Sequence, residues 1–293
     1  MNNRDISVNI AVASGKGGTG KTTISLSLAA YFAETGGPVA VLDCDVEEPN
    51  ANLFLGAAIE RSDPVSVLIP RVDEALCNGR GECERVCMFS AIVLVKDKPL
   101  VFPEMCHSCG GCALACPEKA ITEVEKVIGE VEVGAGGKIL YAGGRLTIGE
   151  PIAPPLIKAV KRYHEGAAVR IYDSPPGTSC PVIESVRGSD FLVLVTEPTP
   201  FGLNDLTLAV EMAKVLGVPF GVVINRSDIG TGDVVDYCRA EGVPVLAQIP
   251  NDRKIAESYS SGDCVSLILK NHREALESIV AHVAENNKRG VRL

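Results

Sequence analysis

The sequence predicts an α/β fold with a doubly wound, mostly parallel sheet that is interrupted by a small cysteine-rich insert. Short apolar runs rich in β-branched residues alternate along the chain with longer stretches of helical periodicity. The apolar runs are continuous rather than alternating, which is typical of strands covered by helices on both faces. Seven of the eleven cysteines fall between Cys77 and Cys116, where this rhythm stops. Repeated strand–helix–strand units on both sides of such an insert indicate parallel pairing through right-handed crossovers.

The individual strands and helices follow in chain order. Residues 6–13 and 39–43 predict two strands, with a helix over residues 21–34 between them. After the insert, apolar runs predict further strands at residues 169–172, 191–196, 220–225 and 245–248. Helical patterns are predicted at residues 152–165, 202–216, 232–241, 253–260 and 272–286. We therefore expect a discontinuous host domain, residues 1–65 and 126–293, around an inserted domain of residues 66–125.

Composition excludes several classes of protein. The 293 residues are 46% hydrophobic and 22% charged, the balance of a folded globular chain rather than a disordered one. The formal net charge of −9 and the lack of a basic run argue against a nucleic-acid partner. The odd number of cysteines, 11, indicates reduced thiols or metal ligands rather than a disulfide framework.

The sequence also lacks the signals of a membrane or exported protein. No apolar stretch approaches the roughly 18 residues that a membrane span needs. The polar start, Met1 to Asp5, predicts no signal peptide. The polar tail at residues 286–293 lacks the large apolar face of a strong membrane anchor. We therefore expect a cytoplasmic protein.

A glycine-rich phosphate-binding loop follows the first predicted strand. It fits the pattern G-x-x-x-x-G-K-[ST] and opens a predicted helix, which is the context that this motif requires. Its residues are Gly15, Lys16, Gly17, Gly18, Thr19, Gly20, Lys21 and Thr22, with Thr23 next in the helix. Backbone N–H groups and the helix N-terminus are expected to bind phosphate oxygens. Lys21 would contact the β- and γ-phosphates, and the Thr22 hydroxyl would ligate Mg²⁺.

The loop contains a lysine in addition to Lys21, and this residue, Lys16, makes the loop resemble that of a known superfamily. The loop is similar to the deviant Walker motif K-G-G-x-G-K-[ST] of the MinD/ParA/nitrogenase-iron-protein ATPases. The resemblance covers about residues 1–55 and 150–270. It implies a P-loop NTPase fold that binds ATP or ADP with Mg²⁺. It also implies an ATP-dependent homodimer, or a heterodimer with a related chain, in which Lys16 reaches the partner's phosphates.

Two segments resemble the switches of that superfamily. Asp43-Cys44-Asp45 closes the second predicted strand, so the resemblance places Asp43 near Mg²⁺ and Asp45 beside the attacking water. Residues 171–178 are similar to the second switch, D-x-P-x-G. The resemblance implies that Asp173 binds a ligand of Mg²⁺ or reaches Mg²⁺ through a bridging water. The resemblance thus implies that Lys16, Lys21, Asp45 and Asp173 are catalytic in phosphoryl transfer to water.

Two further segments correspond to the adenine site of the superfamily. Asn225 and Arg226 end a predicted strand, where the resemblance places a hydrogen bond to adenine. Pro250, in the segment Ile249-Pro250-Asn251-Asp252, would supply backbone around the base. Because open α/β sheets bind ligands at the carboxyl ends of their parallel strands, these segments are expected to meet the phosphate loop there.

The second half of the insert contains a complete iron–sulfur motif. Cys106, Cys109, Cys112 and Cys116 follow the spacing C-x₂-C-x₂-C-x₃-C-P. Three thiolates at this spacing can bind one cubane, and the last cysteine points to a second cluster. Zinc or free thiols are disfavoured by the order of the four cysteines and the final Cys-Pro. The insert therefore resembles a small α+β bacterial two-cluster ferredoxin.

The first half departs from that pattern. Aligned on Cys77, Cys83 and Cys87, it has Arg80 in place of the second cysteine and Met88 in place of proline. Crossed ligation then gives one complete ligand set for a [4Fe–4S] cluster, Cys87, Cys106, Cys109 and Cys112. The other set keeps only Cys77, Cys83 and Cys116. Since arginine stays protonated and is a poor iron ligand, we expect there a [3Fe–4S] cluster, a labile [4Fe–4S] cluster or an empty site.

Three functions are compatible with these motifs. The first is an ATP-dependent redox protein, in which nucleotide-driven switch and dimer changes gate electron transfer from the ferredoxin-like insert to a protein partner. The second is an iron–sulfur cluster carrier or scaffold. The third is a MinD-like positioning ATPase with a structural or redox-sensing cluster. Cys180, an isolated cysteine past the second switch, is expected to be an interface or redox-active thiol rather than a ligand.

Overall fold

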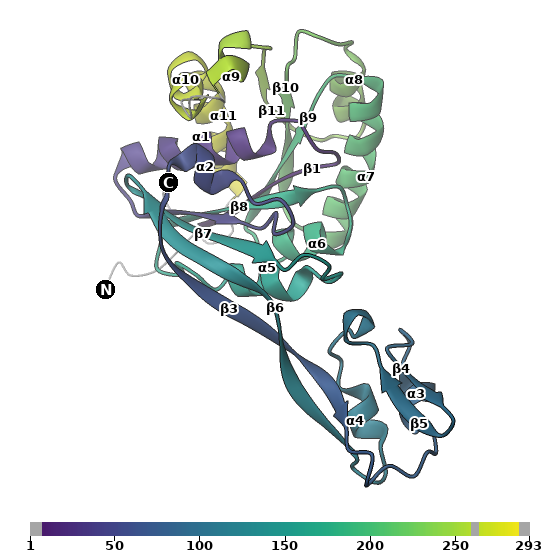
Figure 1. The fold of residues 1–293 in the computed structure, drawn as a ribbon. Helices are drawn as coiled ribbons and strands as arrows, with labels where there is room; N and C mark the ends of the chain where they lie inside the picture. The colour runs from purple at the N-terminus through teal and green to yellow at the C-terminus, as the bar shows by residue number, and fades with distance from the viewer. Residues whose placement is uncertain (1–7, 259–263, 287–293) are drawn as a thin grey trace, which may run out of the picture.

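The computed structural model describes residues 8–258 and 264–286 and contains a nine-stranded sheet (Figure 1). Its strand order is β11-β10-β9-β1-β8-β2-β7-β6-β3. All neighbours from β11 to β7 are parallel, whereas β6 is antiparallel to both β7 and β3. The strands are β1 (Val8–Ser14), β2 (Val39–Asp43), β3 (Ala58–Val72), β6 (Ile121–Gly136), β7 (Ile139–Leu146), β8 (Val169–Pro176), β9 (Phe191–Thr196), β10 (Phe220–Asn225) and β11 (Val245–Ile249). The predicted α/β class with a mostly parallel sheet is confirmed.

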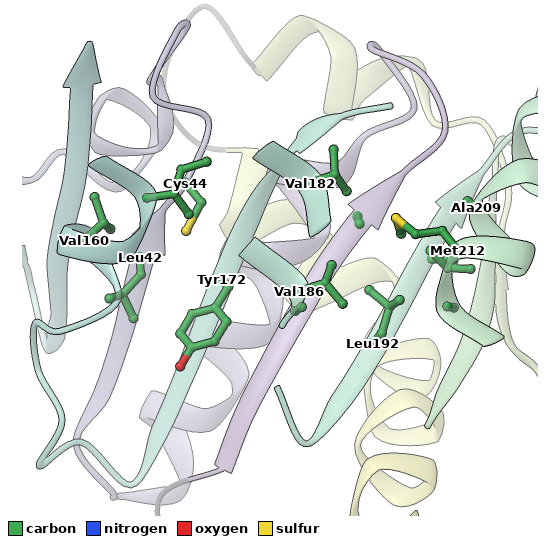
Figure 2. Close-up of a cluster of buried hydrophobic side chains, with 14 of the residues drawn as sticks. Leu42, Cys44, Val160, Tyr172, Val182, Val186, Leu192, Ala209 and Met212 are labelled. Atoms are coloured by element: carbon green, nitrogen blue, oxygen red, sulfur yellow. The ribbon is translucent and has the colours of Figure 1, made fainter. Parts of the chain in front are cut away.

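Helices cover both faces of the parallel part of the sheet. One face packs against α1 (Lys21–Thr35), α2 (Ala51–Leu55), α10 (Cys264–Asn271) and α11 (Arg273–Asn286). The other face packs against α5 (Pro154–Val160), α6 (Cys180–Val186), α7 (Pro200–Leu216) and α8 (Asp233–Ala240). Figure 2 shows this second core, where Cys44 and Tyr172 lie beside Val160, Val182 and Val186. Cys44 is fully buried and packs as a small apolar side chain.

Several predicted helices differ in extent. The helix expected at residues 152–165 is shorter, because α5 ends at Val160 and a turn with a positive φ at His164 follows. The pattern at residues 253–260 forms α9 (Arg253–Ser258), and its last two residues lie outside the described part of the chain. Residues 6 and 7 of the first predicted strand and residues 287–293 of the tail also lie outside it. Within the described residues, no helix is long and apolar enough to cross a membrane.

The insert leaves the sheet as a long ribbon, which consists of β3 and β6. These strands pair from Ala58↔Ala135 to Val72↔Ile121, with register shifts after Ile59 and after Val65. At the far end of the ribbon, residues 73–120 form a small unit, here called the cysteine module (Figure 1). It contains α3 (Glu82–Val86), β4 (Ile92–Val95), β5 (Lys98–Val101), a 3₁₀ turn at Pro103–Met105 and α4 (Gly111–Ala115). The expected domain boundaries near residues 65 and 126 fall inside the ribbon, and the division into two domains stays a prediction.

Candidate functional site

A cavity of about 380 Å³ opens at the carboxyl ends of the parallel strands. It lies between the phosphate loop, the segment after β2 and the segments after β10 and β11, where α/β sheets bind ligands. Ten of the residues predicted to bind nucleotide or act on it line this cavity: Gly17, Gly18, Gly20, Lys21, Thr22, Thr23, Asp45, Asn225, Arg226 and Pro250. Phe54, Ile255 and Ile268 add an apolar wall that the motifs did not indicate.

The geometry of the phosphate loop depends on Gly20 and Asn225. Gly20 has φ +93°, and a Cβ there would clash with the side-chain amide of Asn225. That amide donates a hydrogen bond of 2.8 Å to the backbone oxygen of Thr19. Asn225 therefore fixes the loop ahead of α1 in addition to lining the cavity. The N-terminus of α1, residues Lys21 to Thr23, lines the cavity, and a helix N-terminus favours a bound phosphate.

Five predicted residues lie outside the cavity wall. Gly15 packs tightly on α7, since a Cβ there would clash with the backbone of Asp205. The loop residue Thr19 is buried. Lys16 pairs with Glu197, and Asp43, the last residue of β2, and Asp173, within β8, are both buried. These roles stay predictions.

The carboxylates below the cavity form an acidic floor. Asp43 accepts hydrogen bonds from the backbone N–H groups of Asp45 (3.1 Å), Asn50 (3.0 Å) and Ala51 (3.0 Å), so it shapes the first switch. Burial, and after it the nearby charge of Asp173, raise the pKa of Asp43 well above its usual range. Burial also raises the pKa of Asp45 to about 6, while Lys21 acts in the opposite direction.

This floor fits a divalent cation. Asp173 Oδ1 accepts a hydrogen bond of 2.9 Å from Ser25, but Oδ2 is buried without a partner among the described residues. In the part of the chain that the structure describes, no group of three His, Cys, Asp or Glu side chains is arranged to hold a single metal ion. Mg²⁺ does not require such a cage, because it keeps several waters and binds through few protein groups and substrate phosphates. Thr22, Asp43 and Asp173 therefore suit Mg²⁺ that arrives with a nucleotide.

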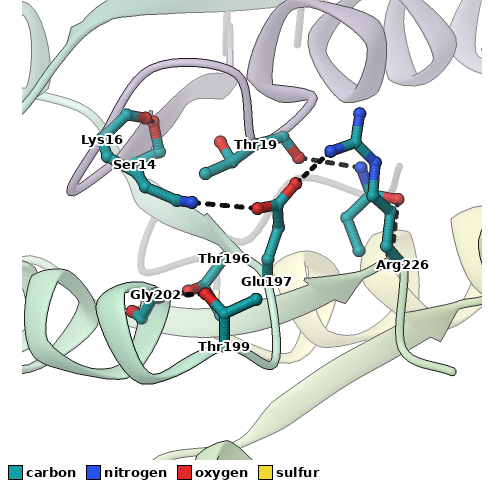
Figure 3. Close-up of polar contacts among 9 residues, drawn as sticks. Ser14, Lys16, Thr19, Thr196, Glu197, Thr199, Gly202 and Arg226 are labelled. Atoms are coloured by element: carbon teal, nitrogen blue, oxygen red, sulfur yellow. Dashed lines mark hydrogen bonds and ion pairs between the residues drawn. The ribbon is translucent and has the colours of Figure 1, made fainter. Parts of the chain in front are cut away.

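Glu197, which no motif indicated, binds two of the predicted residues (Figure 3). Its carboxylate lies 3.0 Å from Lys16 Nζ and 2.5 Å from Arg226 Nη1. The Glu197 side chain is only 7% exposed, so both contacts are stronger than an ordinary surface pair. Glu197 directly follows the buried strand β9, the same signal that singled out Asp43 and Asp173. In this conformation it holds Lys16 within its own subunit.

The seven clustered cysteines separate into two groups in the cysteine module. Cys87, Cys106, Cys109 and Cys112 line one small cavity, here called the four-thiol cavity. Cys77, Cys83 and Cys116 line another, the three-thiol cavity, which Arg80 also borders. Each cavity combines cysteines from both halves of the module, as crossed ferredoxin ligation requires. The structure thus brings together the two sets of thiols that the spacing predicts.

Backbone N–H groups point at the sulfurs of both cavities. Ala91 donates to Cys87 Sγ and Ala120 to Cys116 Sγ, both at 3.3 Å, and Ser108 donates to Cys106 Sγ at 3.4 Å. Although burial acts in the opposite direction, such N–H groups lower the pKa of Cys87. Thiols arranged around a cavity, with backbone donors to their sulfurs, suit a polynuclear cluster rather than one ion. The cysteines present therefore fit an iron–sulfur cluster.

The fold and the cavity at its strand ends define a nucleotide-binding α/β protein. A family model described as the CobQ/CobB/MinD/ParA nucleotide binding domain matches residues 10–265, and the chain belongs to this family. The expected superfamily is thereby confirmed, whereas a ferredoxin-like insert stays a prediction.

Individual relatives agree with this family. The chain is 30% identical to an uncharacterized protein of Methanocaldococcus jannaschii, over 87% of this chain and 90% of that protein. It is 26% identical to an iron–sulfur cluster carrier protein of Pyrococcus abyssi, over 86% of this chain and 77% of that one. Among solved structures, the Mg-ADP complex of the septum site-determining protein MinD from Pyrococcus horikoshii OT3 matches with a TM-score of 0.57. That match has 19% identity and covers 98% of this chain and 100% of MinD, so it supports the fold.

Proposed function

We propose that this chain is an ATP-binding and ATP-hydrolysing iron–sulfur protein in which the nucleotide state gates electron transfer to a protein partner. One observation carries the proposal. The ribbon that bears the cysteine module continues through β7, and β7 pairs directly with β2, the strand that ends in Asp43. A change at the first switch therefore acts on the strand that supports the module.

At the nucleotide, the chain's own residues would stabilise charge and position water. Lys21 at the α1 N-terminus would bind the β- and γ-phosphates, and Thr22 would hold Mg²⁺ against them. Asp45 lines the cavity and would orient the attacking water. Asp173 would bind a ligand of Mg²⁺ or reach Mg²⁺ through a bridging water. Lys16 would have to leave Glu197 to reach a second subunit's phosphates. A dimer of two such chains, or of this chain with a related one, is the expected active form.

In the cysteine module, Cys87, Cys106, Cys109 and Cys112 would hold a [4Fe–4S] cluster. Cys77, Cys83 and Cys116 would hold a [3Fe–4S] or a labile [4Fe–4S] cluster. Such clusters supply one-electron transfer when bound. Cys109 is exposed, so an electron would leave the four-thiol cavity toward a redox protein docked on this side of the module.

The test is anaerobic purification followed by EPR with and without Mg·ATP. We expect a reducible cluster whose signal or midpoint potential changes when Mg·ATP is added. The variant Lys21→Ala should keep the cluster and lose this response, because it removes the phosphate contact and leaves the cysteines intact. A cluster that ignores Mg·ATP in both proteins would refute the gating proposal.

A second candidate function is transfer of the cluster itself. It is supported by the relatives named iron–sulfur cluster carrier protein and by the incomplete ligand set of the three-thiol cavity. The two functions differ in the fate of the iron. Incubation with an apo-ferredoxin should move iron and sulfide to the acceptor if clusters are cargo, and leave them on this chain if they serve electron transfer.

A further inference from the structure

Near the root of the ribbon, where β6 leaves β7 at Gly129, one side chain joins the cysteine module to the host domain. Lys126, on β6, forms an ion pair of 2.7 Å with Glu150, which lies in the host segment between β7 and α5. The same ammonium group donates a hydrogen bond of 3.3 Å to the backbone oxygen of Pro103, in the 3₁₀ turn of the module. One side chain of the ribbon thus binds both bodies at once.

This contact is largely shielded from water. The side chains of Lys126 and Glu150 are 20% and 13% exposed, whereas the pair Lys98–Glu74 within the module is 74% and 67% exposed. Exposed pairs contribute little to stability, but a shielded, charge-assisted contact costs free energy when one partner is removed. Lys126 and Glu150 therefore constrain the module, and Lys98–Glu74 provides a matched control.

The contact also borders the four-thiol cavity. Lys126 and Glu150 line a small cavity between the two bodies, together with Cys106 and Ser108 of the module and Ile152 and Pro155 of the host. Pro103 is the residue bound by Lys126, and its turn leads directly into Cys106. None of the cysteines of the three-thiol cavity lines this junction. Displacement of Glu150 would therefore affect the loop at Cys106, which borders the four-thiol cavity, before it affects the three-thiol cavity.

A chain of contacts leads from Glu150 to the nucleotide cavity. The Glu150 segment runs into α5, and Lys161 at its end donates hydrogen bonds to backbone oxygens near the end of α6, at 2.8 Å to Glu184 and 2.9 Å to Ser185. Helix α6 begins just after the second switch, whose Pro176 lines the nucleotide cavity. The second switch, α6, α5 and the Glu150 segment are therefore physically continuous.

We propose that Lys126 is a positioning residue that anchors the cysteine module to the host domain through Glu150 and carries the nucleotide state to the Cys106 loop. The anchor itself follows from the contacts of Lys126. Its role in signalling rests on the proposed function. The two parts are tested by separate arms of one experiment.

The first arm uses the nucleotide-free protein and hydrogen–deuterium exchange. The variants Lys126→Gln and Glu150→Gln should each raise amide exchange at residues 104–109 and 147–152 about fivefold or more. Lys126→Gln removes both the ion pair and the hydrogen bond to Pro103, whereas Glu150→Gln removes only the ion pair, so the double variant should equal Lys126→Gln. Lys98→Gln should match the unaltered protein. Exchange within about twofold of the unaltered protein in both single variants would overturn the anchor.

The second arm adds Mg·ATP. In the unaltered protein and in Lys98→Gln, Mg·ATP should change exchange at residues 104–109, and in Lys126→Gln most of that change should be lost while nucleotide binding persists. An undiminished response in Lys126→Gln would overturn the signalling role. No response in the unaltered protein would refute the proposed gating, and the first arm would still decide the anchor. Iron content and the EPR signal of every variant, measured before Mg·ATP is added, should match those of the unaltered protein.

Discussion

The two halves of the cysteine module, residues 77–91 and 106–120, have similar backbone conformations and differ in the number of their thiols. Gly81 and Gly110 both adopt the left-handed conformation and precede α3 and α4. Ser90 and Lys119 both have a positive φ, 53° and 51°. Each half ends with a cysteine sulfur that accepts an N–H from an alanine at 3.3 Å. The loops are therefore built alike on both sides.

The difference lies at one position of this repeat. Cys109 lines the four-thiol cavity, and its counterpart Arg80 borders the three-thiol cavity. The Arg80 side chain is exposed, and its backbone N–H and C=O bind Asn78 and Arg85 within the loop. The fold of the first half thus does not depend on a fourth thiol. Its loss changes which group can be bound rather than how the chain folds.

The largest expected effect comes from giving the second half the arginine that the first half has at the matching position. Cys109→Arg should abolish the stable cubane, with iron and sulfide each falling by about four per chain, because the four-thiol cavity loses a ligand. Iron, sulfide and EPR analysis after anaerobic purification measure this. Cys180→Ser, at an exposed cysteine of the host domain, is the control and should lose no iron. A stable cubane in Cys109→Arg would contradict the assigned ligand set.

The reverse substitution should have the opposite effect. Arg80→Cys completes the ligand set of the three-thiol cavity, so iron and sulfide should rise to about eight each per chain. The matched control Arg85→Cys places a new thiol on the neighbouring helix α3, outside the residues that line this cavity, and should leave the iron content unchanged. If Arg80→Cys gains no iron, the two halves differ in more than this one side chain.

The sequence predicts the parallel part of the fold and misses the antiparallel part, for a physical reason. Strands β1, β2 and β9 are buried on both faces and appear as continuous apolar runs. Strand β3 is largely exposed, and the outer part of β6, residues 121–127, is exposed or half-buried at most positions; both segments alternate apolar with charged residues. Pro64 and Pro70 further weaken a strand pattern, although β3 is an edge strand, where proline is tolerated.

The same division holds at the candidate sites. Motif spacing located the phosphate loop and both thiol groups, because local sequence determines loops of this kind. It could not find Glu197 or the pair Lys126–Glu150, since these contacts join segments that only the tertiary fold brings together. Both pairs involve ordinary charged residues without a motif. The contacts are visible only through burial and distance, although the position of Glu197 directly after the apolar strand β9 can be read in the sequence.

A smaller effect should distinguish the two cavities in their response to nucleotide. The four-thiol cavity adjoins the host domain through Cys106, whereas the three-thiol cavity does not. If Mg·ATP binds one redox state about tenfold more tightly, the midpoint potential of the four-thiol cluster shifts by about 59 mV. Redox titration of Arg80→Cys with and without Mg·ATP measures both clusters in one protein. Equal shifts would show that the nucleotide does not act through the junction.

The smallest expected effect concerns the second difference between the halves, Met88 opposite Pro117. Cys87 and Cys116, which precede them, have nearly the same extended backbone, with φ −81° and ψ 103° against φ −77° and ψ 110°. This is the conformation that a residue before proline prefers. Met88 is 87% exposed, so loss of its side chain removes little packing.

Met88→Pro should therefore stabilise the module by about 0.4–1 kcal/mol, because proline restricts the unfolded chain and Pro117 already occupies the matching position of the second half. The thermal midpoint of the cluster-loaded protein, followed anaerobically by cluster absorbance, should rise by about 2 °C or more. Pro117→Met provides the opposite change and should lower that midpoint by a similar amount. A lower midpoint in Met88→Pro would show that the two backbones diverge after the final cysteine, and that the repeat ends there.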